Sequence, residues 1–239
     1  MSTARIRAII RKELREYRHN RQIVITMSVL PLVFSVFPIL QFFAASASAA
    51  NDLARQQPLI YMLALPAIVP GTVAAYSVAG ERQQGTLEPL LSTPLRAEEF
   101  LLGKAIAALI PSLLVSYGVF GVFVVALEFL AQPAVASAVL QGPEVLAQLL
   151  FTPPVAALSI WMSTAISARS SDTRVATQLS TLASVPTVVV TTAIAVGGIN
   201  PTHRLIVLLT VVLLALDGLG WRLVPPLFNR ERLITGTHS

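Results

Sequence analysis

The side chains that could carry out chemistry are few in this sequence of 239 residues, and they do not converge. The three histidines, His19, His203 and His238, lie far apart, and the chain has no cysteine. Transition metals need such ligands at close spacing, so the sequence indicates no metal centre and excludes disulfide bonds. No His-Glu-x-x-His or Gly-x-Ser-x-Gly pattern occurs, so two common hydrolase sites are unsupported.

A nucleotide-binding loop is also missing from the sequence. Such a loop needs a glycine, four further residues and then Gly-Lys-Ser/Thr, so that backbone amides enclose the phosphates. The pair Gly103-Lys104 fails this test, because Glu98 occupies the first glycine position and Ala105 follows the lysine. We therefore predict that this chain is not an enzyme and has no ATPase site or bound cofactor of its own.

One acid, Asp217, lies well inside a hydrophobic run. An acid in a membrane span is by default a candidate for transport or proton transfer. The alternative is a side chain that reaches the interface or pairs with Arg222, because Asp217 is close to the end of its run. Both interpretations stay open at the level of sequence.

The segments of the chain that carry these residues are mostly hydrophobic. Hydrophobic residues make up 54% of the chain and charged residues 12%, whereas soluble domains average about 25% charged. This shortage of polar surface indicates lipid as the solvent. The net charge of +5 is placed beside the hydrophobic runs, which favours membrane electrostatics over nucleic-acid binding.

Six runs are long enough to cross a bilayer, which takes about 20 apolar residues as a helix. The expected fold is an all-α polytopic membrane protein. Its six spans are predicted at residues 23–46, 59–80, 105–129, 145–167, 176–198 and 205–223.

The distribution of lysine and arginine predicts the orientation. Of the 17 such residues, 15 fall on one side of the six runs, and only Arg55 and Arg204 fall on the other. The positive-inside rule then places both termini in the cytoplasm of a bacterium, with the chain in its inner membrane. Cleavage of the first run as a signal peptide is the alternative, suggested by Ala45-Ser46-Ala47, but the run is longer than a signal core.

The N-terminal region, residues 1–22, is expected to form an amphipathic interfacial helix over 2–21. Ile6, Ile9, Ile10, Leu14 and Tyr17 recur at helical spacing with basic residues between them. Such a helix would lie on the cytoplasmic leaflet. A solvated basic tail that only sets the topology is the alternative. Residues 23–224 are expected to form a six-span membrane domain, and residues 225–239 a cytoplasmic tail.

The largest polar connection on the inside is segment 81–104, between the second and third runs. A short cytoplasmic helix is expected after Gly85, with Pro94 ending it and with Glu98 and Glu99 opening the next helix. If a short helix is joined rigidly to two spans, a cytoplasmic partner that pushes on it moves both spans, so that it acts as a lever.

This segment resembles the coupling region of type-2 ABC exporter permeases, as do the six spans and the basic N-terminal helix. The resemblance rests on Glu81-Arg82, Gly85-Thr86-Leu87-Glu88, Leu91-Ser92-Thr93-Pro94, Glu99 and Leu102-Gly103-Lys104. It implies an exporter with two permeases, a homodimer or a pair of related chains, and two ATPase subunits that bind ATP and magnesium. The ATPase-coupling residues implied are Glu81, Arg82, Gly85, Thr86, Leu87, Glu88, Leu91 and Pro94. A second cytoplasmic contact is expected at Arg169, Asp172 and Arg174.

The expected substrate class is inferred only from the shortage of charged side chains in the spans. They offer no charged side chain beyond Asp217, which favours a hydrophobic or amphiphilic substrate. A membrane scaffold or regulator driven by an ATPase is the alternative function. A secondary carrier would need paired intramembrane charges or an internal repeat, and neither is evident. The fifth run could also end as a re-entrant segment broken at Pro186.

Overall fold

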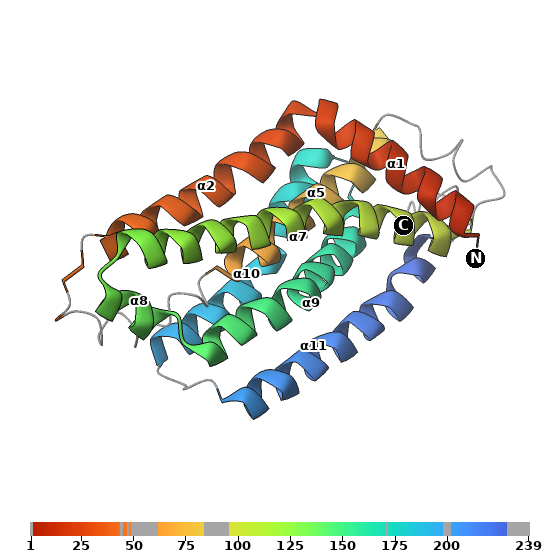
Figure 1. Cartoon of the computed structure of the whole chain (residues 1–239). Coiled ribbons are helices and arrows are strands. Elements are labelled where there is room, and N and C mark those ends of the chain that lie inside the picture. The colour runs from red at the N-terminus through yellow and green to blue at the C-terminus, as the bar shows by residue number, and fades with distance from the viewer. Residues whose placement is uncertain are drawn as a thin grey trace.

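A computed structural model describes residues 2–43, 45–46, 48, 62–83, 96–170, 172–197 and 202–228 of the chain. These residues form helices and no strand, as the sequence predicted (Figure 1). Residues 84–95, which hold most of the expected coupling helix, lie outside the described residues.

In the part of the chain that the structure describes, six helices of 20 residues or more overlap the six predicted runs, and three shorter helices accompany them. The elements are α1 (Thr3–His19), α2 (Arg21–Phe43), α5 (Ala64–Gln83), α7 (Ala97–Leu130), α8 (Pro133–Val139), α9 (Gly142–Ser167), α10 (Thr173–Gly197), α11 (His203–Leu223) and the 3-10 helix η2 (Pro225–Phe228). Within the described residues, α7, α9 and the segment His203–Phe228 are long and apolar enough to cross a membrane. The count of six spans stays a prediction.

Helix α7 begins at Ala97, one to two turns before the predicted span at 105–129. The Glu99 side chain accepts the backbone N–H of Arg96 at 3.5 Å, and Glu98 and Glu99 both lie in the first turn. Acids at this position cap free N–H groups and favour the helix dipole. The prediction that these acids open the helix is confirmed, and the helix extends beyond the purely apolar run.

Helix α10 passes through Pro186 as one continuous helix. The suggested break and re-entrant turn at this proline is therefore wrong for the described backbone. Between α7 and α9, Pro133 starts the short helix α8 instead of only interrupting the connection. Proline suits the first turn of a helix, because no N–H is needed there.

Helices α5 and α9 lie side by side and run in the same direction. Ser159 donates to the carbonyl of Ala67 at 2.5 Å, and Ser167 donates to that of Ala75 at 3.2 Å, with a separation of 92 residues in both pairs. Between these bonds, a Cβ on Gly71 would lie 2.3 Å from the Ser159 hydroxyl, so only glycine permits this approach. Small residues bring helices close enough in lipid for such bonds.

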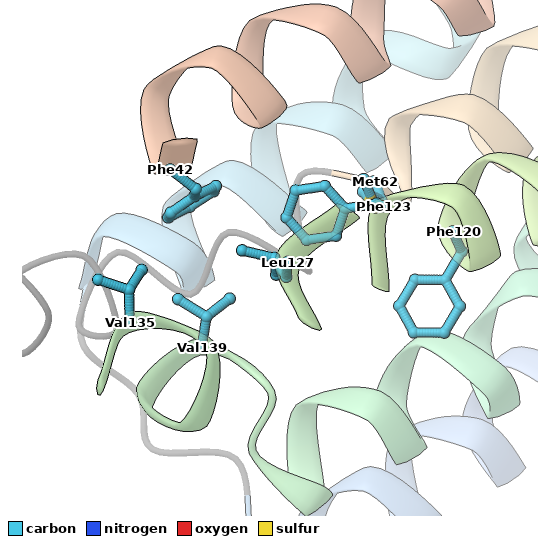
Figure 2. Packing of buried hydrophobic residues seen from close by; sticks show 7 residues of the cluster. All are labelled: Phe42, Met62, Phe120, Phe123, Leu127, Val135 and Val139. Atoms are coloured by element: carbon cyan, nitrogen blue, oxygen red, sulfur yellow. The ribbon is translucent and has the colours of Figure 1, made fainter. Parts of the chain in front are cut away.

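Two apolar clusters mark the ends of the bundle. At one end, called here the α8 end, Phe42 and Phe123 meet edge to face with centroids 5.7 Å apart, and α8 contributes Val135 and Val139 (Figure 2). At the other, called the basic end, η2 packs through Phe228 against the start of α7 and the end of α9. Helix α1 crosses the basic end beside α5 and α7.

Candidate functional site

Helix α1 is docked on the membrane helices through the face that carries its apolar residues. Ile9 and Tyr17 are buried, and Ile6, Ile10 and Leu14 are partly buried. A Cβ on Gly103 of α7 would lie 2.7 Å from Ile9, so the glycine lets α1 approach α7 closely. The backbone is helical over Thr3–His19, within the predicted range. Its apolar stripe packs largely on the protein, whereas the sequence suggested the bilayer as its only partner. The place of this helix at the membrane interface stays a prediction.

The start of α1 is fixed to the start of α7 through Glu99. This carboxylate is 2% exposed and accepts the backbone N–H of Ser2 at 2.6 Å. The guanidinium of Arg5 lies 3.5 Å from the same side chain. Glu99 therefore caps its own helix and holds the neighbouring one.

A buried charged cluster joins α1, α5 and α7 near the middle of α1. Lys104 of α7 is 4% exposed, and its ammonium lies 2.9 Å from Glu13 of α1 and 3.2 Å from Glu81 of α5. The ammonium also donates to the hydroxyl of Ser77 at 2.6 Å, and this hydroxyl donates to Glu13 at 2.6 Å. Lys12 completes the cluster, 2.5 Å from Glu81 and 3.0 Å from Glu13.

The charges of this cluster balance, with two lysines facing two buried carboxylates. Burial alone would raise the pKa of Glu13, but the Lys104 ammonium and the Ser77 hydroxyl outweigh it and hold the pKa below its ordinary value. Burial would likewise lower the pKa of Lys12, but the hydrogen bond and the charges of Glu81 and Glu13 raise it instead. These two shifts favour the charged forms of Glu13 and Lys12, and all three helices contribute to the contacts of the cluster.

Two of the predicted coupling residues are placed by this arrangement. Glu81 belongs to the charged cluster, and Arg82 follows it in the last turn of α5. The other six, Gly85, Thr86, Leu87, Glu88, Leu91 and Pro94, lie outside the described residues. The segment that holds them leaves α5 just after Glu81 and enters α7 about two turns before Lys104, so the cluster stands at both of its ends.

The second predicted contact is the exposed turn between α9 and α10. Arg169, Asp172 and Arg174 are all exposed there, and Asp172 caps α10 by accepting the backbone N–H of Arg174 at 2.7 Å. Thr173 at the start of α10 donates to Gln83 at the end of α5 at 3.0 Å. The last turn of α5, with Glu81 and Arg82, and the turn between α9 and α10 thus lie at the same end of the bundle.

Comparison with known families agrees with this geometry. The family described as ABC-2 family transporter protein matches residues 7–207, which is most of the chain and includes the charged cluster. The chain belongs to the ABC-2 transporter family. It is therefore a membrane-embedded permease domain of an ABC transporter, a class that works with an ABC ATPase subunit. No curated protein matches this ABC-2 permease significantly.

The remaining predicted site residue, Asp217, lies apart from the cluster. It is half-buried on α11, and one of its carboxylate oxygens is buried without a hydrogen-bond partner. Arg222 is exposed one turn later, and no ion pair joins the two side chains. The pairing suggested from the sequence of this permease is therefore not formed.

Sequence reasoning missed the burial of Glu13 and Lys104. Lys104 was counted as a charge flanking a span, and Glu13 was not singled out. One signal was present: Glu13 stands midway between Ile9 and Tyr17, at i+4 from each, on the apolar face of α1. A lone charge on an apolar helix face indicates a buried partner of opposite charge. The statement that the spans hold no acid beyond Asp217 was also wrong, because α9 begins early enough to bury Glu144.

Proposed function

We propose that this chain is the permease subunit of an ATP-binding-cassette exporter that moves a hydrophobic or amphiphilic substrate outward. Two copies of a separate ATPase would bind ATP and magnesium and contact the basic end, and a second permease, identical or related, would complete the pathway. The protein would lie in the bacterial inner membrane with both termini in the cytoplasm. Family membership and the apolar helices support one part of this proposal, that the chain is a membrane-embedded permease domain of an ABC transporter.

The charged cluster is the observation that carries the proposal. Separating buried, paired charges leaves an uncompensated charge in a low dielectric, which costs several kcal/mol. The ends of α5 and α7 and the middle of α1 therefore move together when segment 84–95 between them is pushed. A rigid three-helix unit whose α5 and α7 are joined in sequence by segment 84–95 suits the transmission of force from an ATPase.

The exposed turn between α9 and α10 supports a second contact at the same end. Its three charged side chains point outward from backbone that is held by the Asp172 cap. The hydrogen bond from Thr173 to Gln83 links this turn to the last residue of α5. A partner that covers segment 84–95 would then also reach Arg169 and Arg174.

Reconstitution of the permease with its ATPase, the gene for which we expect beside that of the permease, tests the proposal. Leu87→Asp should abolish stimulation of ATP hydrolysis by the permease, because an apolar contact with the ATPase is replaced by a charge, while insertion into the membrane is unchanged. Ser137→Asp is the matched control, since Ser137 is exposed on α8 at the other end. Unchanged stimulation in Leu87→Asp would contradict the proposed lever.

Efflux of fluorescent amphiphiles from the same vesicles separates the exporter from the regulator. ATP-dependent efflux that is lost in Leu87→Asp is the expected result. Coupled ATP hydrolysis without movement of any amphiphile would favour the regulator and would contradict an export function.

A further inference from the structure

Helix α9 carries a row of buried polar side chains toward the α8 end. Glu144, Gln148 and Thr152 recur every four residues and therefore share one face, and they are 3%, 1% and 0% exposed. This row is separate from the charged cluster at the basic end, and the proposed coupling makes no use of it.

Two acceptor atoms in this row are buried without a partner. They are a carboxylate oxygen of Glu144 and the amide oxygen of Gln148. The amide nitrogen of Gln148 is already directed at the hydroxyl of Thr152, 3.4 Å away, and this hydroxyl donates to the backbone carbonyl of Gln148 at 2.6 Å. The bonds within the row therefore leave these two buried oxygens without a partner.

Two prolines also remove backbone donors in this stretch of α9. The carbonyl of Leu150 would accept from the N–H of residue 154 in an α-helix or of residue 153 in a 3-10 turn, and both are proline. The carbonyl of Leu149 loses its α-helical donor for the same reason, but the hydroxyl of Tyr117 on α7 replaces it at 2.9 Å. The consecutive prolines thus make this part of α9 poorer in backbone donors than a regular helix.

Helix α7 contacts this stretch of α9 and carries another unpartnered group. The bond from Tyr117 to Leu149 places α7 beside α9, and the adjacent Ser116 is 2% exposed with a hydroxyl that has no partner. No described lysine, arginine or histidine forms an ion pair with Glu144. The exposed His203 and Arg204 at the start of α11 are among those that do not.

A buried carboxylate needs a counter-charge, and oxygen acceptors without donors attract a cation. We propose that Glu144 and Gln148 bind a monovalent cation on the buried face of α9, either an alkali ion or a primary ammonium group. One carboxylate balances one positive charge, whereas a divalent ion would leave a buried excess. In agreement, no three histidine or acidic side chains gather in the described part of the chain. This site does not depend on the proposed export function.

Thermal unfolding of the purified full-length permease in detergent tests the proposal. The midpoint is measured in sodium, potassium and methylammonium chloride at equal ionic strength, with choline chloride as a reference ion too large and without N–H donors. We expect at least one small cation to raise the midpoint saturably, by about 2–4 °C at about five times its dissociation constant. A response to alkali ions identifies an inorganic ion, and a response to methylammonium alone identifies an amine group.

Variants at the row decide whether the response belongs to this site. Glu144→Gln and Gln148→Leu should each remove or weaken the cation response, while Glu128→Gln, an exposed acid on α7, should keep it. Saturable binding of radioactive sodium or methylamine to the wild type gives a readout if a variant fails to fold. Equal midpoints in all four salts, or a response that persists in Glu144→Gln, would overturn the proposal and leave Glu144 as an acid neutralised by a proton.

Discussion

Replacement of Lys104 by methionine tests whether the charged cluster holds the three helices together. The change keeps a similar side-chain length and removes the ammonium from between Glu13 and Glu81, whose side chains are 1% and 5% exposed. Removing one partner of a buried ion pair costs about 3–5 kcal/mol. Lys12 still reaches both carboxylates, so we expect the low end of this range, about 3 kcal/mol.

A loss of this size should be visible in a thermal unfolding experiment. In chains of 150–250 residues 1 kcal/mol shifts the midpoint by about 2–4 °C, so Lys104→Met should lower it by about 6–12 °C. The fluorescence of Trp161 and Trp221 is a suitable probe, because the two rings pack 5.7 Å apart near the basic end and are the chain's only tryptophans.

Lys12→Met is the matched control, since Lys12 is the chain's other lysine and is about half exposed. Its partners Glu13 and Glu81 are buried, but its own ammonium is half exposed and Lys104 still faces both acids. We therefore expect a smaller loss of about 1 kcal/mol, which lowers the midpoint by about 2–4 °C. The double variant Lys104→Met with Glu13→Gln removes one acid together with the cation. Its loss of unfolding free energy should be smaller than the sum of the two single losses by at least about 1 kcal/mol. A midpoint of Lys104→Met within 2 °C of wild type, or strictly additive effects, would refute the cluster as a clamp.

Three further outcomes are expected. The pKa of Glu13 is held below its ordinary value of 4.5, so the charged carboxylate stabilises the fold above that pH, and this stabilisation is lost as the pH falls through the folded pKa. The unfolding midpoint of the wild type should therefore decrease below about pH 5, and that of Glu13→Gln should decrease less steeply. Gly103→Ala should displace α1 and destabilise the protein by about 1–3 kcal/mol in the same assay, whereas Gly121→Ala, with open space around it, should have little effect. In intact cells a membrane-impermeant maleimide should label Ser137→Cys and should not label Arg169→Cys. The experiment needs no other substitution, because the chain has no cysteine. The reverse labelling pattern would contradict the predicted orientation.

The helices could be predicted from the sequence because hydrophobic length alone decides where a spanning helix can form. Their ends could not, since the first turn of α7 is polar and is held by Glu99, a side chain that hydropathy counts only as a break. For the same reason, hydropathy assigned Glu144 to a connection, whereas the structure places it in the first turn of α9. Hydropathy measures transfer to lipid and does not register capping bonds.

The charged cluster needed three-dimensional contacts to be found. Lys104 and Glu13 are 91 residues apart, and only the crossing of α1 over α7 brings them together. From the sequence, Lys104 belongs to a set of basic residues that set the topology, and fourteen other such residues carry the same signal. Glu81 was selected through its resemblance to a coupling motif, and the structure adds a partner that the motif does not reveal.

The parallel contact between α5 and α9 also has a consequence for biosynthesis. Ala67, Gly71 and Ala75 on α5 find their partners 92 residues later in the chain. At a translation rate of about 5–20 residues per second, α5 emerges from the ribosome about 5–20 s before α9 does. During this interval the small-residue face of α5 must be covered by lipid or by the insertion machinery, and two later helices must enter the membrane before it is buried.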